Sequence, residues 1–284
     1  MEKRAVLNPT RRTQKAKPRH PMTWKRQVKR LGILLGCAYV LIVLIAAFFG
    51  DRLIFPAPKS SYSDLPGLFK ISTPDGEAIS ATYLQQPSAG YTILYSHGNG
   101  EDLGTVMTVC ELLRQSGFNV LAYDYRGYGT SEGSAGESSA CADIRAAYDH
   151  LTGPLGVKPE RIIVLGRSVG GGPSVDLAAQ KPVGALILES AFTSAFRIPL
   201  RVRILPWDKF DNLSKLPGVN CPVLVIHGAD DWIISSWHGR RLFAVAPEPK
   251  RHLWVERAGH NDLVGVAGKR YTAAIRDFAN SLAE

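Results

Sequence analysis

The chain has 284 residues, enough for one large domain or two small ones, and its 45% hydrophobic content is ordinary for a protein with a sizeable core. Its net charge of +9 lies at one end: residues 1–30 hold eleven Lys and Arg against one Glu, a net +10, so the other 254 residues carry about −1. A near-neutral body lacks the basic surface that nucleic-acid binding requires, and we predict no nucleic-acid partner.

Residues 31–50, LGILLGCAYVLIVLIAAFFG, form an uncharged apolar run directly after the basic segment. As a helix, such a run is about 30 Å long, which matches the hydrocarbon core of a bilayer. A cleaved signal peptide is the alternative, but its apolar region is usually only about 7–15 residues. The sequence LLGC resembles a lipoprotein box, yet few apolar residues precede Cys37, so we expect Cys37 to be an ordinary helix residue. We predict an uncleaved membrane anchor.

The charge imbalance predicts the orientation of this anchor. Cationic flanks stay on the cytoplasmic side, so the N-terminus is expected inside and the body on the periplasmic or luminal side. The predicted organisation is a basic cytoplasmic tail (1–30), a transmembrane anchor (31–50), a linker (51–66) and a folded domain (67–284).

Short apolar runs alternate with helix-like stretches through the body. Two runs at 67–73 and 79–86 flank a Pro-Asp-Gly turn and predict a β-hairpin. Further buried strands are predicted at 91–98, 119–127, 161–168, 185–190, 222–228 and 251–260, with helices at about 101–116, 138–152, 168–180, 235–246 and 262–282. This alternation predicts an α/β fold with a mostly parallel, doubly wound sheet and no second domain. Residues 191–220 contain no clear strand and are long enough only for a small cap.

The segment VLGRSVGGG contains the pattern G-x-S-x-G at the junction of a predicted strand and helix, with Ser168 at its centre. In a strand–turn–helix elbow, small neighbours let the turn tighten and expose the serine as a nucleophile. Ser168 as a plain helix N-cap is the alternative interpretation.

A serine nucleophile needs a base and a residue that orients the base. His260 follows the last predicted strand, and Asp231 follows the strand before it, in the order Ser, acid, His of α/β-hydrolases. We predict a triad of Ser168, Asp231 and His260. Asp230 and Glu189 remain alternatives for the acid, since each also lies near a strand end.

An acyl-transfer site also needs N–H donors for the oxyanion. We assign these to the backbone of Val169, which follows the serine, and of Asn99, in the HGNG turn. His97 and His227 end two predicted strands and are expected to be structural. Arg167 is a candidate for contacting an anionic substrate group, although partly exposed packing is the more common role of a residue there.

Several phrases of the body together resemble the α/β-hydrolase superfamily over residues 65–284: SHGNGEDLG, AYDYRGYGTSEG, GRSVGGG, ESAFTS, PVLVIHGADD and GHNDL. The set is similar to single-pass membrane serine hydrolases described as serine aminopeptidase-like, which are related to eukaryotic α/β-hydrolase-domain depalmitoylases. The resemblance implies an esterase, thioesterase or peptidase with no metal and no organic cofactor. It implies no substrate, and this chain lacks the N-terminal cysteine cluster of the depalmitoylases.

The loop DYRGYGTSEG, residues 124–133, either frames the pocket entrance or closes the sheet with a local ion pair between Asp124 and Arg126. Cys110, Cys141 and Cys221 match no zinc spacing and are expected to be buried, although one disulfide is possible in an oxidising compartment.

Taken together, the sequence predicts a membrane-anchored serine hydrolase of acyl esters or thioesters, through a Ser-His-Asp triad and an acyl-enzyme. A peptidase with the same triad and a non-catalytic membrane scaffold are the alternatives. The expected partners are an acyl ester, thioester or small peptide substrate and the membrane, through residues 31–50.

Overall fold

The computed structural model describes residues 24–65 and 67–282, so most of the predicted basic tail lies outside the described residues. The chain divides into two compact units, Met1–Ala47 and Phe48–Glu284. In its described part the first unit is helical and belongs to α1, Trp24–Ile54. This helix is longer than the predicted span at both ends, and its last residues, Phe48–Ile54, belong to the second unit.

Helix α1 is long and apolar enough to cross a membrane, with a mean hydropathy of 2.8 over its most apolar stretch. Its apolar side chains, such as Leu35 and Phe48, are largely exposed. Apolar side chains gain free energy when an apolar environment covers them.

The second unit contains an eight-stranded sheet with the order β1-β2-β4-β3-β5-β6-β7-β8. Its first strands form the predicted antiparallel hairpin, β2 is also antiparallel to β4, and the other neighbouring strands are parallel. The strands are β1 Leu68–Ser72, β2 Ala78–Leu84, β3 Thr92–Ser96, β4 Asn119–Tyr123, β5 Ile162–Arg167, β6 Ala185–Glu189, β7 Val223–Gly228 and β8 Lys250–Val255. The predicted mostly parallel sheet is confirmed.

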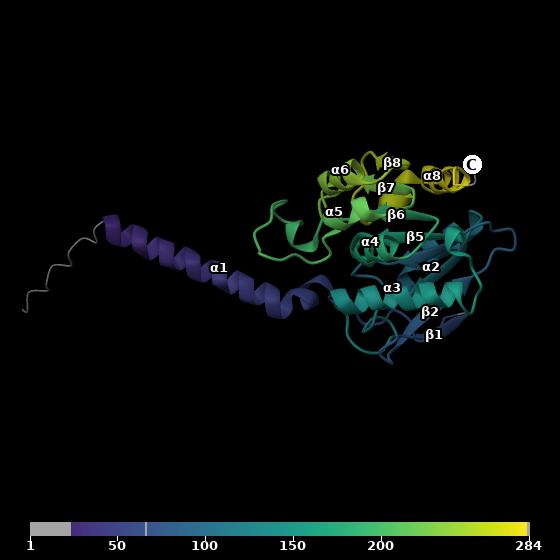
Figure 1. Cartoon of the computed structure of the whole chain (residues 1–284), viewed down its shortest axis with the longest axis horizontal. Coiled ribbons are helices and arrows are strands. Elements are labelled where there is room, and N and C mark those ends of the chain that lie inside the picture. Colours follow the sequence, from purple (N-terminus) through teal and green to yellow (C-terminus); the bar gives the residue numbers. More distant parts are fainter. Residues whose placement is uncertain (1–23, 66, 283–284) are drawn as a thin grey trace, which may run out of the picture. The chain divides into compact units, whose positions relative to one another are not determined.

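Helices follow the strands as predicted, and Figure 1 shows α3 and α4 lying over the sheet. They are α2 Leu103–Gln115, α3 Glu137–Thr152, α4 Gly171–Gln180, α5 Asn212–Lys215, α6 Ser236–Val245, α7 Leu263–Ala267 and α8 Lys269–Asn280. Short 3₁₀ turns occupy Pro159–Arg161, Ser168–Gly170, Ala195–Arg197 and Leu216–Gly218. The helix predicted over 262–282 is interrupted at Gly268, whose φ of 53° lies in the left-handed region.

The two faces of the sheet bury separate hydrophobic clusters. Leu94 packs into the cluster that contains α3 and α4 residues, whereas its neighbours Ile93 and Tyr95 pack into the cluster that contains α2 and α8 residues. Successive side chains of a strand point to opposite faces, so a strand covered on both sides must be apolar throughout. All five residues of β3 are buried, which explains the continuous apolar runs in the sequence.

Parallel strands with helices on both faces bring their carboxyl ends to one edge of the sheet. Ser168 follows β5, Asp231 follows β7 and His260 follows β8. The fold therefore places the three predicted catalytic residues at the same edge.

Candidate active site

Ser168 directly follows β5 and is the first residue of the 3₁₀ turn that leads into α4. Its φ is 54°, in the left-handed region that a non-glycine residue adopts only at a cost. The glycines of the motif leave room for the turn: a Cβ at Gly166 would lie 2.4 Å from the carbonyl oxygen of Gly170, and one at Gly170 would lie 2.2 Å from that of Ser96. The local sequence thus permits a strained elbow rather than a simple helix cap.

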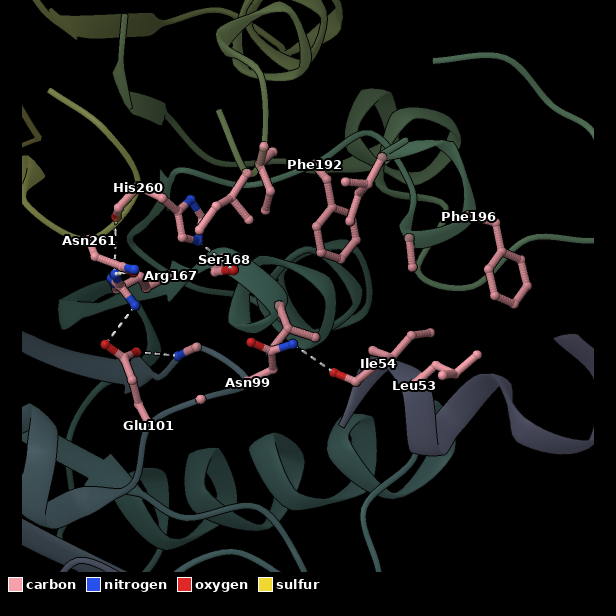
Figure 2. A pocket seen from close by; sticks show the side chains of 17 residues that line it. Leu53, Ile54, Asn99, Glu101, Arg167, Ser168, Phe192, Phe196, His260 and Asn261 are labelled. Atoms are coloured by element: carbon pink, nitrogen blue, oxygen red, sulfur yellow. Dashed lines mark hydrogen bonds and ion pairs between the residues drawn. The ribbon is translucent and has the colours of Figure 1, made fainter. Parts of the chain in front are cut away.

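His260 lies beside this elbow, in the loop between β8 and α7 (Figure 2). Its Nε2 is 3.0 Å from the hydroxyl oxygen of Ser168. The loop is tightened at its base, where the N–H of Gly259 donates to the carboxylate of Asp262 at 2.7 Å. Ser168 is 6% and His260 7% exposed, so the pair is shielded from bulk water and still open to the pocket described below.

Asp231 completes a continuous hydrogen-bonded line. Its Oδ2 is 2.7 Å from Nδ1 of His260, and its Oδ1 accepts from the N–H groups of Ile233 and Ile234 at 3.0 and 2.7 Å. Burial alone raises the pKa of Asp231, but hydrogen bonds from His227, His260 and the backbone outweigh it and hold the pKa well below its usual value. The acid is therefore ionised and fixes His260 with Nε2 facing the serine.

The two alternative acids lie elsewhere. Asp230 is exposed. The carboxylate of Glu189 accepts from the hydroxyl of Tyr271 at 2.7 Å and lies 3.3 Å from Nε of Arg167. Of the three candidates, it is Asp231 that contacts the imidazole.

His227 supports the acid, and His97 supports the sheet. His227 is fully buried, with Nε2 2.8 Å from the carbonyl oxygen of Ile234 and 3.4 Å from Oδ2 of Asp231. His97 is also fully buried and lies 3.2 Å from the carboxylate of Asp124. Both histidines have the structural environment that we expected of them.

A cavity of about 630 Å³ opens in front of Ser168. Apolar side chains form much of its wall, and several come from the segment 191–220 that was expected to form a small cap. The cavity is lined by Leu53, Ile54, Gly98, Asn99, Gly100, Glu101, Arg167, Ser168, Val169, Phe192, Ala195, Phe196, Ile198, Ile233, Ile234, His260 and Asn261. A site of this size with a few convergent polar groups can hold a small organic substrate or part of a larger one.

Both residues predicted to supply oxyanion donors line this cavity. Val169 follows the serine directly, and Asn99 lies in the turn after β3. Two hydrogen bonds hold Asn99. Its side-chain amide nitrogen donates to the main-chain carbonyl oxygen of Ile54 at 3.1 Å, and its main-chain carbonyl oxygen accepts from the hydroxyl of Tyr128 at 2.9 Å. Figure 2 shows Asn99 between Ser168 and the end of α1.

The loop at residues 124–133 behaves differently from both expectations. Within the described part of the chain none of its residues lines the cavity. Tyr128 instead donates a hydrogen bond to the main-chain carbonyl oxygen of Asn99, which does line it. The expected ion pair of Asp124 with Arg126 does not form: Asp124 contacts His97, and Arg126 pairs with Asp143 at 2.6 Å and with Asp75. That expectation was wrong because the two side chains diverge from neighbouring positions of the chain.

Arg167 lines the cavity and is more buried than the partly exposed packing role would have it. Its side chain is mostly buried and pairs with Glu101 at 2.6 Å, and its Nη2 donates to the carbonyl oxygen of His260. Glu101 and Asn261 also line the cavity. Both residues lie within phrases that carry the family resemblance, SHGNGEDLG and GHNDL, but the sequence assigned neither of them a role.

The three cysteines of the second unit do not line the cavity. Cys110, Cys141 and Cys221 are buried and unpaired, and burial raises the pKa of each thiol to about 12. Over residues 24–65 and 67–282, no three His, Cys, Asp or Glu side chains cluster in a way that suits a metal ion.

Several known proteins are similar to this chain. Residues 87–216 match the family described as serine aminopeptidase, S33. The human α/β-hydrolase domain-containing protein 17B is 41% identical over 209 residues, which are 72% of this chain and 73% of that protein. The chain belongs to the α/β-hydrolase family. It is therefore a hydrolase of the same type as the α/β-hydrolase domain-containing proteins 17.

One further sequence relative and one solved structure are also similar to this chain. The protein aho-3 of Caenorhabditis elegans, also an α/β-hydrolase domain-containing protein, is 42% identical over 183 residues, 62% of this chain and 54% of its own. An esterase from Pyrococcus furiosus is 19% identical, with a TM-score of 0.66 over 79% of this chain and 98% of that one. At that identity the likeness concerns the fold alone.

Proposed function

We propose that this hydrolase is a membrane-anchored serine hydrolase that cleaves acyl esters or thioesters through an acyl-enzyme. The observation that carries the proposal is the hydrogen-bonded line from Asp231 through His260 to Ser168, at the mouth of a partly apolar cavity. A serine hydroxyl becomes a useful nucleophile when a base oriented by a third group takes its proton, and these contacts supply both.

In the first half of the reaction, the Ser168 oxygen attacks the substrate carbonyl carbon while its proton passes to Nε2 of His260. The carbonyl oxygen becomes an oxyanion, for which the backbone N–H groups of Val169 and Asn99 are the assigned donors. The ionised Asp231 stabilises the imidazolium that forms. When the tetrahedral intermediate collapses, His260 returns the proton to the departing alcohol or thiol, and the acyl group remains on Ser168.

In the second half, a water molecule gives a proton to His260 and attacks the acyl-enzyme carbonyl. Collapse of this second intermediate releases the carboxylic acid and restores the Ser168 hydroxyl with the proton from His260. The partly apolar cavity lined by Phe192 and Ile198 suits the acyl group. This wall supports an ester or thioester with an apolar acyl group over a charged small molecule.

We also propose that α1 anchors the enzyme, with the basic segment 1–30 on the cytoplasmic side and the catalytic domain on the other. The length and hydropathy of α1 support the anchor. The charge of the preceding segment supports the orientation.

Peptidase activity with the same triad is the second candidate, favoured by the match to the serine aminopeptidase family. Purified full-length protein in detergent, assayed on p-nitrophenyl acyl esters, acyl thioesters and aminoacyl anilides, separates the two. We expect ester and thioester turnover that the Ser168→Ala variant lacks. Turnover of anilides alone would assign the site to peptide bonds, and no turnover of any substrate above the Ser168→Ala background would favour a non-catalytic scaffold.

A further inference from the structure

Arg167 immediately precedes the nucleophile Ser168, and its guanidinium lies at the centre of a cluster of polar groups. The residue is 9% exposed, and two carboxylates face it, those of Glu101 and Glu189. Burial by itself lowers the pKa of Arg167, but these two carboxylates raise it above its usual value, so the side chain stays charged. Figure 2 shows Arg167 between Glu101 on one side and Asn261 on the other.

One side of the guanidinium binds the loop that carries the base. Nη2 of Arg167 donates to the main-chain carbonyl oxygen of His260 and to Oδ1 of Asn261, both at 3.1 Å. Because the first of these acceptors belongs to the backbone of His260 itself, the contact ties the position of the imidazole to that of the residue before Ser168. A planar guanidinium imposes direction as well as distance on such contacts.

The other side binds the loop that carries Asn99. Nη1 of Arg167 is 2.6 Å from Oε1 of Glu101, whose Oε2 accepts from the N–H of Gly98 at 2.7 Å. The next peptide along the chain is the one whose N–H is assigned to the oxyanion. Arg167 therefore holds this turn through Glu101, one hydrogen bond away from the proposed donor.

Gly98 provides independent support for this arrangement. A Cβ at this position would lie 2.8 Å from Oε2 of Glu101 and 2.9 Å from Nη1 of Arg167. Both atoms thus approach the backbone so closely that a side chain would displace them. The absence of a side chain at Gly98 is what lets the ion pair pack against the turn.

Glu189 pairs with Nε, the third nitrogen of the guanidinium. Its carboxylate lies 3.3 Å from Nε of Arg167 and accepts from the hydroxyl of Tyr271 on α8. Each of the three guanidinium nitrogens therefore has an acceptor from the protein. An arginine held in this way is committed to the protein and is poorly placed to bind an anionic substrate group.

We propose that Arg167 is a positioning residue, which holds the His260 loop and the Asn99 turn in register on either side of Ser168. The proposal rests on the proposed serine-hydrolase function. Arg167 takes no part in bond making: it acts through the base and through the oxyanion donor. It joins the three parts of the site that come from separate strand ends.

The test compares Arg167→Met, which removes the charge and every hydrogen bond, with Arg167→Lys, which keeps the charge without the planar donor set. Arg126→Met is the matched control, because Arg126 is also buried (6% exposed) and paired with two carboxylates, those of Asp143 and Asp75, but does not line the cavity. Full-length proteins in detergent are assayed for kcat and KM on p-nitrophenyl butyrate, for the rate of inactivation by a fluorophosphonate, and for thermal unfolding.

For Arg167→Met we expect kcat and the inactivation rate to fall roughly 10- to 100-fold, the loss typical of a misplaced catalytic group, with KM changed by less than about threefold. Arg167→Lys should recover part of that loss. Arg126→Met should lower the unfolding temperature while the folded fraction keeps the wild-type kcat. If Arg167→Met raises KM alone, or keeps the wild-type inactivation rate, the positioning role is wrong.

A double-mutant cycle with Glu101→Gln tests the link to the Asn99 turn. If Glu101 acts through the ion pair, the double variant loses little more than Arg167→Met alone, whereas independent effects multiply. Fully multiplicative losses would contradict the link. The reaction of the wild type with the fluorophosphonate distinguishes failure of the proposed function from failure of this inference. A wild type that does not react rejects the proposed serine-hydrolase function. A wild type that reacts, together with an equally reactive Arg167→Met, rejects only the positioning role of Arg167.

Discussion

The carboxylate oxygen Oδ2 of Asp231 lies 2.7 Å from Nδ1 of His260, and the opposite edge of the imidazole faces Ser168 at 3.0 Å. The imidazole is thus held between an anion and a hydroxyl. The same carboxylate is fixed by two backbone N–H groups, those of Ile233 and Ile234. The tautomer that leaves Nε2 free to accept the serine proton is the one this arrangement stabilises.

Asp231→Asn should therefore lower kcat on acyl esters by about 10³- to 10⁴-fold, because an amide both loses the charge and favours the wrong tautomer. The neighbouring substitution Asp230→Asn is the matched control, since Asp230 is exposed. It should leave kcat within about twofold of wild type, as expected of a surface change away from the reacting groups. Steady-state kinetics of the two variants side by side checks the assignment, and equal losses in both would refute it.

The elbow predicts a sharp difference between two glycines. Gly170→Ala should abolish activity and lower the yield of folded protein, since its Cβ would lie 2.2 Å from the carbonyl oxygen of Ser96. Gly265→Ala, in α7, meets no atom within 4 Å and should be neutral or slightly stabilising, by up to about 1 kcal/mol. Thermal unfolding and esterase assays of both variants make the comparison. Wild-type behaviour of Gly170→Ala would show that the turn is looser than described.

Sequence patterns predicted the parts of the site that are local. Ser168 and His260 lie in short motifs at strand ends, and the strand order then fixes which loops meet. The Arg167–Glu101 pair was beyond such reasoning, because nothing within either local segment indicates a partner 66 positions away that only the sheet topology brings near. The same limit explains the wrong pairing of Asp124 with Arg126, which are close in sequence but turn to different partners.

Element boundaries were less predictable than element types. The single helix expected over 262–282 is two helices, because Gly268 adopts a φ of 53° that ends the first one. A glycine within an apolar-periodic stretch signals such a break only weakly, since helices also tolerate glycine.

The burial of His238 predicts that the stability of the protein depends on pH. It is fully buried, its Nδ1 accepts from the N–H of Thr193 at 3.3 Å, and burial lowers its pKa to about 4. The unfolded chain then binds more protons than the folded protein between about pH 6.5 and 4, so the free energy of unfolding falls as the pH falls through this range. Groups that face His238 include His227, Arg201 and Asp231.

Replacing His238 by Gln keeps a side-chain acceptor for Thr193 but removes the titration. Denaturant unfolding of the full-length protein in detergent, at pH 7 and pH 4.5, should show a loss on the order of 2 kcal/mol in wild type that is clearly smaller in His238→Gln. The comparison is between the pH-dependent losses of the two proteins, since every other titratable group is the same in both. Identical losses would mean that His238 takes up its proton without cost.

The wall of the cavity predicts chain-length selectivity. Ala195 lines it and is 9% exposed, so Ala195→Trp places a bulky ring in the space assigned to the acyl group. We expect kcat/KM to fall roughly tenfold or more for octanoyl esters and much less for acetyl esters, since one misfit in a pocket costs about 1–3 kcal/mol. The acetyl ester serves as the internal control. An equal loss on both esters would show that Ala195 borders the reacting centre rather than the acyl group.

Fluorophosphonate labelling of membrane fractions that contain full-length wild type or Ser168→Ala tests most directly whether Ser168 is an activated nucleophile. Such a probe reacts with a serine that a base and oxyanion donors have activated. We expect strong labelling of wild type that disappears in Ser168→Ala. An unlabelled but folded wild type, or labelling that persists in the variant, would contradict it.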